Sequence, residues 1–191
     1  MGSGTVTEDP FTDPYGLHLH NAHWAATFVG FGAPASYWWW DIYVDPLNLW
    51  SLTKGLSLLL QGTNPVEMQS SEISTLKSTS TLLLSDQVNV LGWIRHNDYD
   101  RSAKARLLLE AAIKSLKTKK PPQTKFPDPK SQGGKVSIPV QVNGKYQVTV
   151  LATKSGRTLK SYNLDSKDSK ITFTIPAFVG DVAFKAVRKV G

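Results

Sequence analysis

Residues 35–43 read Ala-Ser-Tyr-Trp-Trp-Trp-Asp-Ile-Tyr, which places three of the chain's six tryptophans side by side and a carboxylate directly after them. Prolines bound this stretch on both sides. A short apolar and aromatic run between such breaks predicts a strand over 35–40 that is buried on both faces, as in a parallel sheet covered by helices. Alternation along the strand would send Trp38 and Trp40 to the same face. The alternative is that all three indoles belong to an ordinary core, because aromatic clusters usually do.

Helical patterns flank this predicted strand. Upstream, apolar residues recur at helical spacing over 17–31, and two glycines supply a stop. Downstream, a second pattern with leucines on one face covers 46–60, and Asp45 is predicted to be its N-cap. The order helix, strand, helix predicts a fragment of an α/β barrel, since a complete barrel needs eight strand–helix units and about 250 residues.

The period of the sequence changes after about residue 70. Short apolar runs alternate with polar turns, and a helix whose Leu109, Ile113 and Leu116 form an apolar stripe interrupts them at about 101–118. The short runs that we predict to be strands lie near 73–76, 82–84, 88–94, 136–140, 146–150, 157–164, 171–175 and 182–187. We therefore expect a barrel segment at 1–70 and an antiparallel β-sandwich with an inserted helix at 71–191.

Two of these strands, 136–140 and 146–150, suggest a hairpin. A two-residue turn at Asn143-Gly144 would pair Val140 with the polar Gln147. A three-residue loop over 142–144 would instead pair Val140 with Tyr146, apolar with apolar, and leave Gly144 at the position where glycine is favoured. The sequence favours the second arrangement.

Composition excludes several classes of protein. The 191 residues contain no cysteine, so a disulfide framework and a thiolate metal site are both excluded. No run reaches the roughly 18 apolar residues of a membrane span, so we expect no membrane among the partners. No signal peptide is visible at the start of the sequence. His18, His20 and His23 do not share a helix face, so we predict no metal site, and nothing indicates a cofactor.

The positive charge is concentrated in one segment. The chain has a net charge of +7, and residues 97–130 account for +5 of it. Clustered Lys and Arg can bind nucleic acid or another polyanion, but Phe126 is the only aromatic residue in 101–130, so no stacking platform is evident. We therefore expect a solvated helix face and a flexible loop, with polyanion binding as the alternative.

A longer series joins these pieces: Asp13-Pro14 and Gly16, Leu-His-Asn-Ala at 19–22, Trp24-Ala25, and Tyr-Trp-Trp-Trp-Asp at 37–41. Over residues 13–62 this series resembles the last part of the catalytic barrel in cellulase-like and mannanase-like glycoside hydrolases of family 5. Some members of that family carry a C-terminal β-sandwich, to which residues 91–95 are similar.

The resemblance implies hydrolysis of β-linked polysaccharide by two glutamates, which in a retaining enzyme lie about 5 to 5.5 Å apart. One would follow the fourth barrel strand, which this sequence does not contain. For the other, Glu8 is the only candidate, and its alternative is a solvated loop carboxylate. Whether the chain is an enzyme therefore stays open, and we expect little or no activity from it alone.

The resemblance also implies where sugar would bind. Trp38, Trp40 and Asp41 would line the substrate cleft after the last barrel strand, and His20 with Asn21 would contribute from the preceding helix. The implied partners are a polysaccharide or oligosaccharide and the remainder of the barrel, at an extracellular or cell-surface location. The alternative function is a non-catalytic carbohydrate-binding or structural β-sandwich module, in which these tryptophans and Trp50 are scaffolding.

Overall fold

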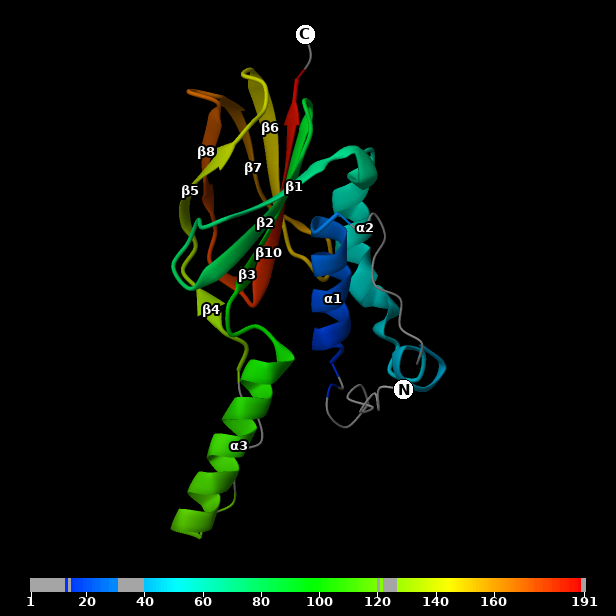
Figure 1. The fold of residues 1–191 in the computed structure, drawn as a ribbon, viewed down its shortest axis with the longest axis vertical. Helices are drawn as coiled ribbons and strands as arrows, with labels where there is room; N and C mark the ends of the chain where they lie inside the picture. The colour runs from blue at the N-terminus through cyan, green and yellow to red at the C-terminus, as the bar shows by residue number, and fades with distance from the viewer. Residues whose placement is uncertain (1–12, 14, 31–39, 120, 122–126, 190–191) are drawn as a thin grey trace.

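The structure, a computed structural model, describes residues 13, 15–30, 40–119, 121 and 127–189. Its centre is a six-stranded antiparallel sheet in the order β1-β2-β3-β10-β6-β7 (Figure 1). The bounds of these strands are β1 Gln69–Ile73, β2 Thr79–Ser85, β3 Asn89–His96, β6 Lys145–Leu151, β7 Thr158–Asp165 and β10 Asp181–Arg188. Two short antiparallel pairs complete the strands: β5 (Gly134–Pro139) with β8 (Lys170–Ile175), and β4 (Lys130–Ser131) with β9 (Phe178–Val179).

The helices fall into two groups. Those before the sheet are α1 (Leu17–Phe28), the π-helical turn η1 (Trp40–Val44), the 3-10 turn η2 (Leu49–Thr53), α2 (Lys54–Leu60) and the 3-10 turn η3 (Pro65–Glu67). The long α3 (Arg101–Thr118) follows β3. In the part of the chain that the structure describes, no helix is both long and apolar enough to cross a membrane.

The six-stranded sheet is covered on both faces. The β5–β8 pair lies against one face, and α1 with α2 lies against the other (Figure 1). Strand β3 shows the division by its alternation, because Val90 and Ile94 join the core under β5 and β8 while Leu91 and Trp93 join the core under the helices. The predicted β-sandwich is therefore present, and a helical layer packs on its outer face.

The predicted hairpin between 136–140 and 146–150 is wrong. Strand β5 pairs with β8, whereas β6 pairs with β7 and β10, so the two strands belong to different sheets. Residues 140–144 carry the chain from one sheet to the other. The apolar residues of both strands enter the same core, facing each other across it, and this arrangement needs the same alternation as a hairpin does.

The predicted barrel fragment is not shown by the structure. Residues 31–39 lie outside the described residues, and Trp40, the last residue of the predicted strand, begins the π-helical turn instead. The predicted helix over 46–60 is shorter, since Asn48 has a left-handed backbone (φ 51°) and the α-helical part begins only at Lys54. The predicted upstream helix is confirmed as α1, which ends at Phe28 just before Gly30 (φ 88°).

A glycine sets how closely α2 approaches the sandwich. A Cβ atom on Gly55 would lie 1.6 Å from the backbone carbonyl oxygen of Thr153, in the turn between β6 and β7. The absence of a side chain therefore lets the helix backbone touch that turn directly. Next to this contact, Leu56 and Leu59 are buried with Trp24 and Phe28 of α1 against the sheet.

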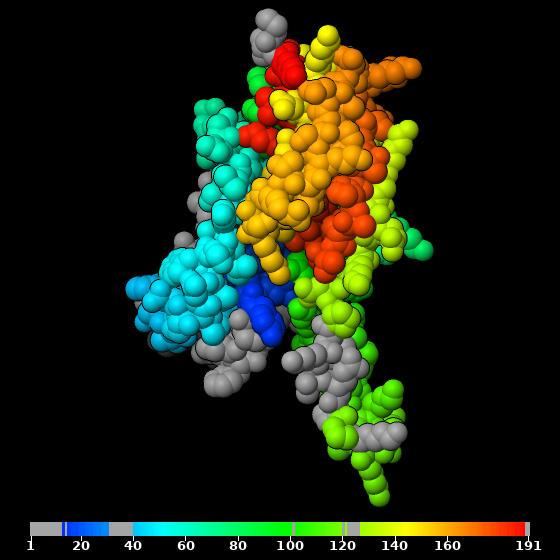
Figure 2. Space-filling view, turned by 180° about the vertical axis from the view of Figure 1, so that it is seen from behind, coloured from blue at the N-terminus to red at the C-terminus, as the bar shows by residue number. Residues whose placement is uncertain are grey.

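The predicted helix at 101–118 is confirmed as α3, but its stripe does not enter the core. Leu109, Ile113 and Leu116 are 62%, 45% and 82% exposed. The helix extends away from the sheets, beyond the end of the sandwich where β4 lies (Figures 1 and 2).

Candidate functional site

The residues predicted to bind sugar are found in different environments. Glu8 and Trp38 lie outside the described residues. Trp40 and Asp41 are exposed on η1, whereas His20 and Asn21 are residues of α1 and are buried on its inner side. The structure thus separates the four described residues into a surface site and a buried site.

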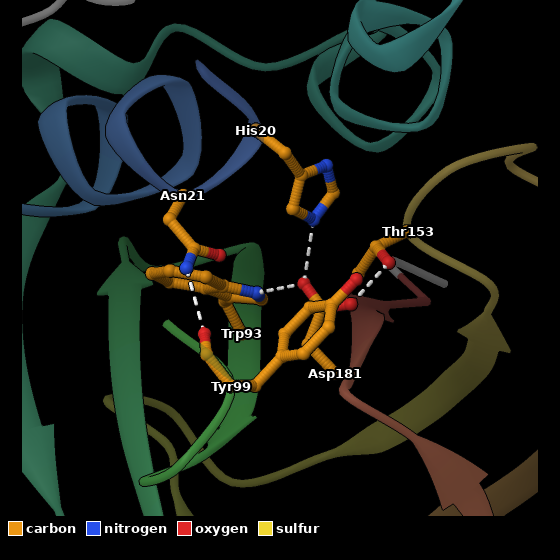
Figure 3. Close-up of polar contacts among 6 residues, drawn as sticks. All are labelled: His20, Asn21, Trp93, Tyr99, Thr153 and Asp181. Carbon is orange, nitrogen blue, oxygen red and sulfur yellow. Dashed lines mark hydrogen bonds and ion pairs between the residues drawn. The ribbon is translucent and has the colours of Figure 1, made fainter. Parts of the chain in front are cut away.

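The buried site is organised around Asp181, the first residue of β10. One carboxylate oxygen, Oδ2, lies 2.7 Å from His20 Nε2 and accepts a hydrogen bond of 2.7 Å from the indole N–H of Trp93. The other oxygen, Oδ1, accepts a hydrogen bond of 2.7 Å from the hydroxyl of Thr153. Figure 3 shows the three side chains converging on this carboxylate. We call these four residues the Asp181 cluster.

Two opposing effects act on the pKa of Asp181. Burial raises it, because a charged carboxylate loses its water. The facing His20 imidazole and the hydrogen bonds from His20, Thr153 and Trp93 lower it by more, so the pKa of Asp181 lies below its ordinary value. The carboxylate is therefore ionised while fully enclosed, and its partners hold it in that state.

The Asp181 cluster joins four parts of the fold. His20 comes from α1, Trp93 from β3, Thr153 from the β6–β7 turn, and Asp181 from β10. The side chains of His20 and Asp181 are 0% and 2% exposed, and both carboxylate oxygens already accept hydrogen bonds. This geometry fits a structural junction between helix and sandwich better than a catalytic acid, which must reach its substrate.

Asn21 strengthens the same junction. Its side-chain N–H donates a hydrogen bond of 2.7 Å to the backbone carbonyl of Tyr99 (Figure 3). The Tyr99 ring is packed against Gly180 (φ 74°), where an added Cβ would lie 2.5 Å from the ring. Burial and the nearby carboxylates of Asp181, Asp128 and Asp13 raise the pKa of Tyr99, so its hydroxyl stays neutral. His20 and Asn21 are thus closed to solvent, and their role in a sugar cleft stays a prediction.

A cavity of about 380 Å³ lies beside the cluster. Its lining includes Tyr99, Asp128, Thr153, Lys154, Phe178 and Asp181. Its charged groups have partners: Lys104 Nζ lies 2.7 Å from Asp128 Oδ1 at the rim, and Lys154 Nζ lies 5.8 Å from the centre of the Tyr99 ring. Trp40, Asp41, His20 and Asn21, the described residues that the sequence indicated for sugar binding, are not among those that line this cavity.

The surface site lies on residues 40–50, which protrude at the side of the molecule (Figure 2). Three large apolar side chains are open to solvent here: Trp40 at 54%, Ile42 at 54% and Trp50 at 48% exposure. Asp41 and Asp45 are exposed between them. We call these five residues the aromatic platform.

Buried neighbours in the same segment hold the aromatic platform in place. Tyr43 and Val44 are buried, and the Tyr43 hydroxyl donates to both the backbone carbonyl and the carboxylate of Asp13, at 2.9 Å each. That carboxylate in turn accepts the backbone N–H groups of Leu17 and His18 at the start of α1. The platform is therefore connected to the first turn of α1 through Asp13.

Asp45 has a different role from the predicted helix cap. Its carboxylate accepts a hydrogen bond of 3.0 Å from the indole N–H of Trp50, because the left-handed Asn48 turns the chain before any helix begins. This bond holds one indole in a fixed orientation with its ring partly in solvent. A flat apolar ring beside carboxylate acceptors can bind a sugar, since the ring covers C–H groups and the carboxylates accept hydroxyl hydrogens.

The sequence contained only part of this information. Trp40 and Asp41 were indicated by their type and order, but nothing in the spacing connects His20 with Asp181, which lies 161 residues further along the chain. Trp93 was recognised as part of a strand and Asp181 as part of a turn. Their meeting at one carboxylate depends on the pairing of β3 with β10.

Comparisons with known proteins add little. A scan of protein-family models and a search of curated proteins found no match to this chain. Among solved structures, a GH30 endoxylanase from Clostridium papyrosolvens C71 aligns with a TM-score of 0.35 and 8% sequence identity. The alignment covers 70% of this chain and 26% of the xylanase chain. A TM-score this low does not establish a shared fold, and it assigns no activity to this chain.

Proposed function

We propose that this chain is the C-terminal portion of a cellulase-like glycoside hydrolase acting on β-linked polysaccharide, and that its aromatic platform forms part of the wall of the substrate cleft. The observation that carries this proposal is the joint exposure of Trp40 and Trp50 on an anchored segment. The resemblance of residues 13–62 to the end of a family 5 barrel supports it.

The platform has the composition of a binding surface. Exposed apolar side chains that cluster within one segment, rather than occurring singly, mark interaction sites. Here Trp40, Ile42 and Trp50 are all exposed within residues 40–50, and Asp41 and Asp45 are exposed acceptors in the same segment. In a complete barrel, this surface would meet both the sugar and the neighbouring barrel segments.

Catalysis would depend on groups outside the described structure. The buried carboxylate of Asp181 accepts hydrogen bonds at both oxygens and is closed to solvent, so it does not suit the role of a glycosidase acid or nucleophile. We expect the catalytic glutamates in the remainder of the barrel, with Glu8 as the single candidate in this sequence. The location outside the cell is part of the same proposal.

Affinity electrophoresis in gels that contain soluble β-glucan, mannan or xylan tests the platform. The chain should be retarded by at least one of these polysaccharides, and Trp40→Ala and Trp50→Ala should each migrate faster than the unmodified chain in the same gel. Val66→Ala is the matched control, because Val66 is 71% exposed in η3 and lies outside the platform. Equal retardation of the tryptophan variants and the unmodified chain would contradict the proposal.

The alternative, a non-catalytic module, is favoured by the structural character of the Asp181 cluster. In the first proposal the platform contacts both a sugar and the rest of a barrel, whereas a non-catalytic module has no barrel to contact. Binding of sugar by the chain alone fits both functions, whereas absence of binding in every gel favours a purely structural module. Turnover of a β-linked glucan or mannan by this chain alone would contradict the assignment of catalysis to residues elsewhere.

A further inference from the structure

Helix α3 carries a second group of exposed apolar side chains, separate from the aromatic platform. With 3.6 residues per turn, Leu108, Leu109, Ile113 and Leu116 fall within an arc of about 140° on this helix. They are 44%, 62%, 45% and 82% exposed. Ala105 and Ala112, which lie in the same arc, are exposed as well. We call these six residues the apolar stripe.

Most of the stripe lies on the side of α3 away from the buried positions that the structure describes. The buried and partly buried positions of α3 are Ala103, Lys104, Leu107, Ala111 and Ser115 among the side chains that the structure describes. Helical geometry places Ala103 and Leu107 opposite the stripe, and Lys104, Ala111 and Ser115 toward its Leu108 edge. Figures 1 and 2 show that the helix projects beyond the sandwich, so the sheets leave the stripe uncovered. An 18-residue helix is about 27 Å long, enough to present the stripe as a continuous row.

Basic side chains flank the stripe. Residues 101–119 include six basic residues and a single acidic one, Glu110, which gives a net charge of +5. Arg106 and Lys117 border one edge of the stripe, with Glu110 next to Lys117, and Lys104 borders the other edge. Arg106 and Lys117 are exposed. Arg106 has an exposed partner, Asp98, at 3.6 Å, and Lys104 pairs with Asp128 at 2.7 Å.

The positive charge of α3 indicates what kind of partner the stripe binds. A second copy of the helix would bring another +5 against the first, which disfavours pairing of two copies through this face. A protein groove typically receives aromatic anchors, whereas the large residues of the stripe are all aliphatic. A basic, amphipathic helix with leucines on its apolar side has the pattern of helices that lie in a membrane interface, with lysine stems reaching back to the headgroups.

We propose that α3 binds anionic lipid surfaces, with the apolar stripe in the interfacial region and the flanking Lys and Arg side chains at the headgroups. The expectation that no membrane takes part came from the lack of a spanning helix. A helix lying flat on the surface needs no span, so the proposal departs from that expectation without requiring a membrane-crossing segment. The inference does not depend on the proposed function of the platform.

Co-sedimentation of the full 191-residue chain with lipid vesicles tests the proposal. The chain should bind vesicles of phosphatidylcholine with phosphatidylserine at least about tenfold more tightly than vesicles of phosphatidylcholine alone. Added salt should weaken this binding, because it screens the attraction between lysines and headgroups. Equal binding to both vesicle types, or to neither, would overturn the proposal.

Two pairs of variants separate the apolar from the electrostatic part. L109Q/L116Q should lower binding to anionic vesicles at least about tenfold, because the apolar area entering the interface is lost. Its matched control, V66Q/V179Q, changes two residues that are 71% and 53% exposed elsewhere and should bind like the unmodified chain. R106Q/K117Q should also weaken binding, while K135Q/K145Q, at exposed positions on β5 and β6, should do so less.

Two results would refute the assignment even if vesicles bind. Unchanged binding by L109Q/L116Q, with the helix content confirmed by circular dichroism, would show that the stripe does not enter the lipid. A dimer in analytical ultracentrifugation that L109Q/L116Q abolishes would show that a second copy covers this face instead.

Discussion

Helix α3 has the more regular apolar pattern but is exposed, whereas helix α1 has the less regular pattern but is buried. Helix α3 has a regular apolar stripe, yet the stripe is exposed along its length. Helix α1 mixes histidines, an asparagine and aromatic residues, yet seven of its twelve residues are buried. Its inner side holds Trp24 and Phe28 in the core and His20 in the Asp181 cluster.

The difference shows that periodicity identifies a helix without telling what covers it. The position of α1 is set by specific partners, a carboxylate 161 residues away and an indole on β3. The stripe of α3 has no such partner among the described residues. The following predictions test whether α1 and α2 are held by these contacts, and whether α3 is independent of them.

The largest effect is expected from Asp181→Ala. The substitution leaves the His20 ring, the Trp93 indole N–H and the Thr153 hydroxyl buried without their acceptor, and breaking such a buried polar cluster costs about 3 to 5 kcal/mol. Urea denaturation followed by tryptophan fluorescence measures the loss. Asp165→Ala, at the exposed end of β7, is the control and should change stability by less than about 0.5 kcal/mol. Similar stabilities for the two variants would show that the cluster does not hold α1 in place.

Leu59→Ala in α2 should follow in size. Leu59 is 0% exposed in the core between the helices and the sheet, and truncation of a buried leucine costs about 2 to 5 kcal/mol. The urea midpoint should fall while the slope of the transition stays the same. A change in slope would instead indicate that the helical layer unfolds separately from the sandwich.

The sequence was sufficient where a feature depends on near neighbours. Strands β2, β3, β7, β8 and β10, the break at Ser85-Asp86 and the turn at Ser155-Gly156 follow from local alternation and turn residues, and the structure has them. It was insufficient where two arrangements need the same pattern. Val140 and Tyr146 would be apolar neighbours in a hairpin and are apolar partners across a core, so alternation alone could not separate the two.

The candidate sites divide in the same way. The type and order of Trp40 and Asp41 pointed to a surface that could bind sugar, and this needed no knowledge of distant residues. The Asp181 cluster required the pairing of β3 with β10 and the docking of α1, which no spacing in the sequence encodes. The role of Asp45 depended on the left-handed backbone of Asn48, an uncommon conformation that the residue type permits but does not require.

Gly55→Ala tests the contact between α2 and the β6–β7 turn. Its Cβ would lie 1.6 Å from the Thr153 carbonyl oxygen, so the helix must move away from the sandwich, and such overpacking costs about 1 to 3 kcal/mol. Ser57→Ala is the control, because Ser57 is exposed on the same helix and alanine there should stabilise it slightly. A neutral Gly55→Ala would mean that α2 can shift without loss.

The pH dependence of stability should be modest and confined to acid. Burial raises the pKa of Asp86, but hydrogen bonds from the Asn89 and Val88 backbones and the Asn89 side chain lower it by a larger amount. The folded pKa of Asp86 therefore lies below the ordinary 3.8, and the folded pKa of Asp181 does so too. A carboxylate with a lowered pKa stabilises the fold above its unfolded pKa and loses this contribution as pH falls through the folded pKa. The urea midpoint should therefore be level above about pH 5 and fall below about pH 4.

Asp86→Asn isolates one part of this dependence. The amide oxygen can still accept the backbone N–H groups of Val88 and Asn89, but the group no longer titrates. The decline below pH 4 should become shallower in this variant. A decline as steep as in the unmodified chain would show that the turn at Asp86 contributes nothing to it.

The smallest effect is expected from Leu116→Ala, which replaces the same residue type as Leu59→Ala. Leu116 is 82% exposed on α3, and alanine favours helix at least as well as leucine, so stability should change by less than about 0.5 kcal/mol. Urea denaturation of the two variants under identical conditions makes the comparison direct. A loss approaching that of Leu59→Ala would mean that the stripe is covered in solution, by a second copy or by another part of the chain, and that α3 resembles α1 after all.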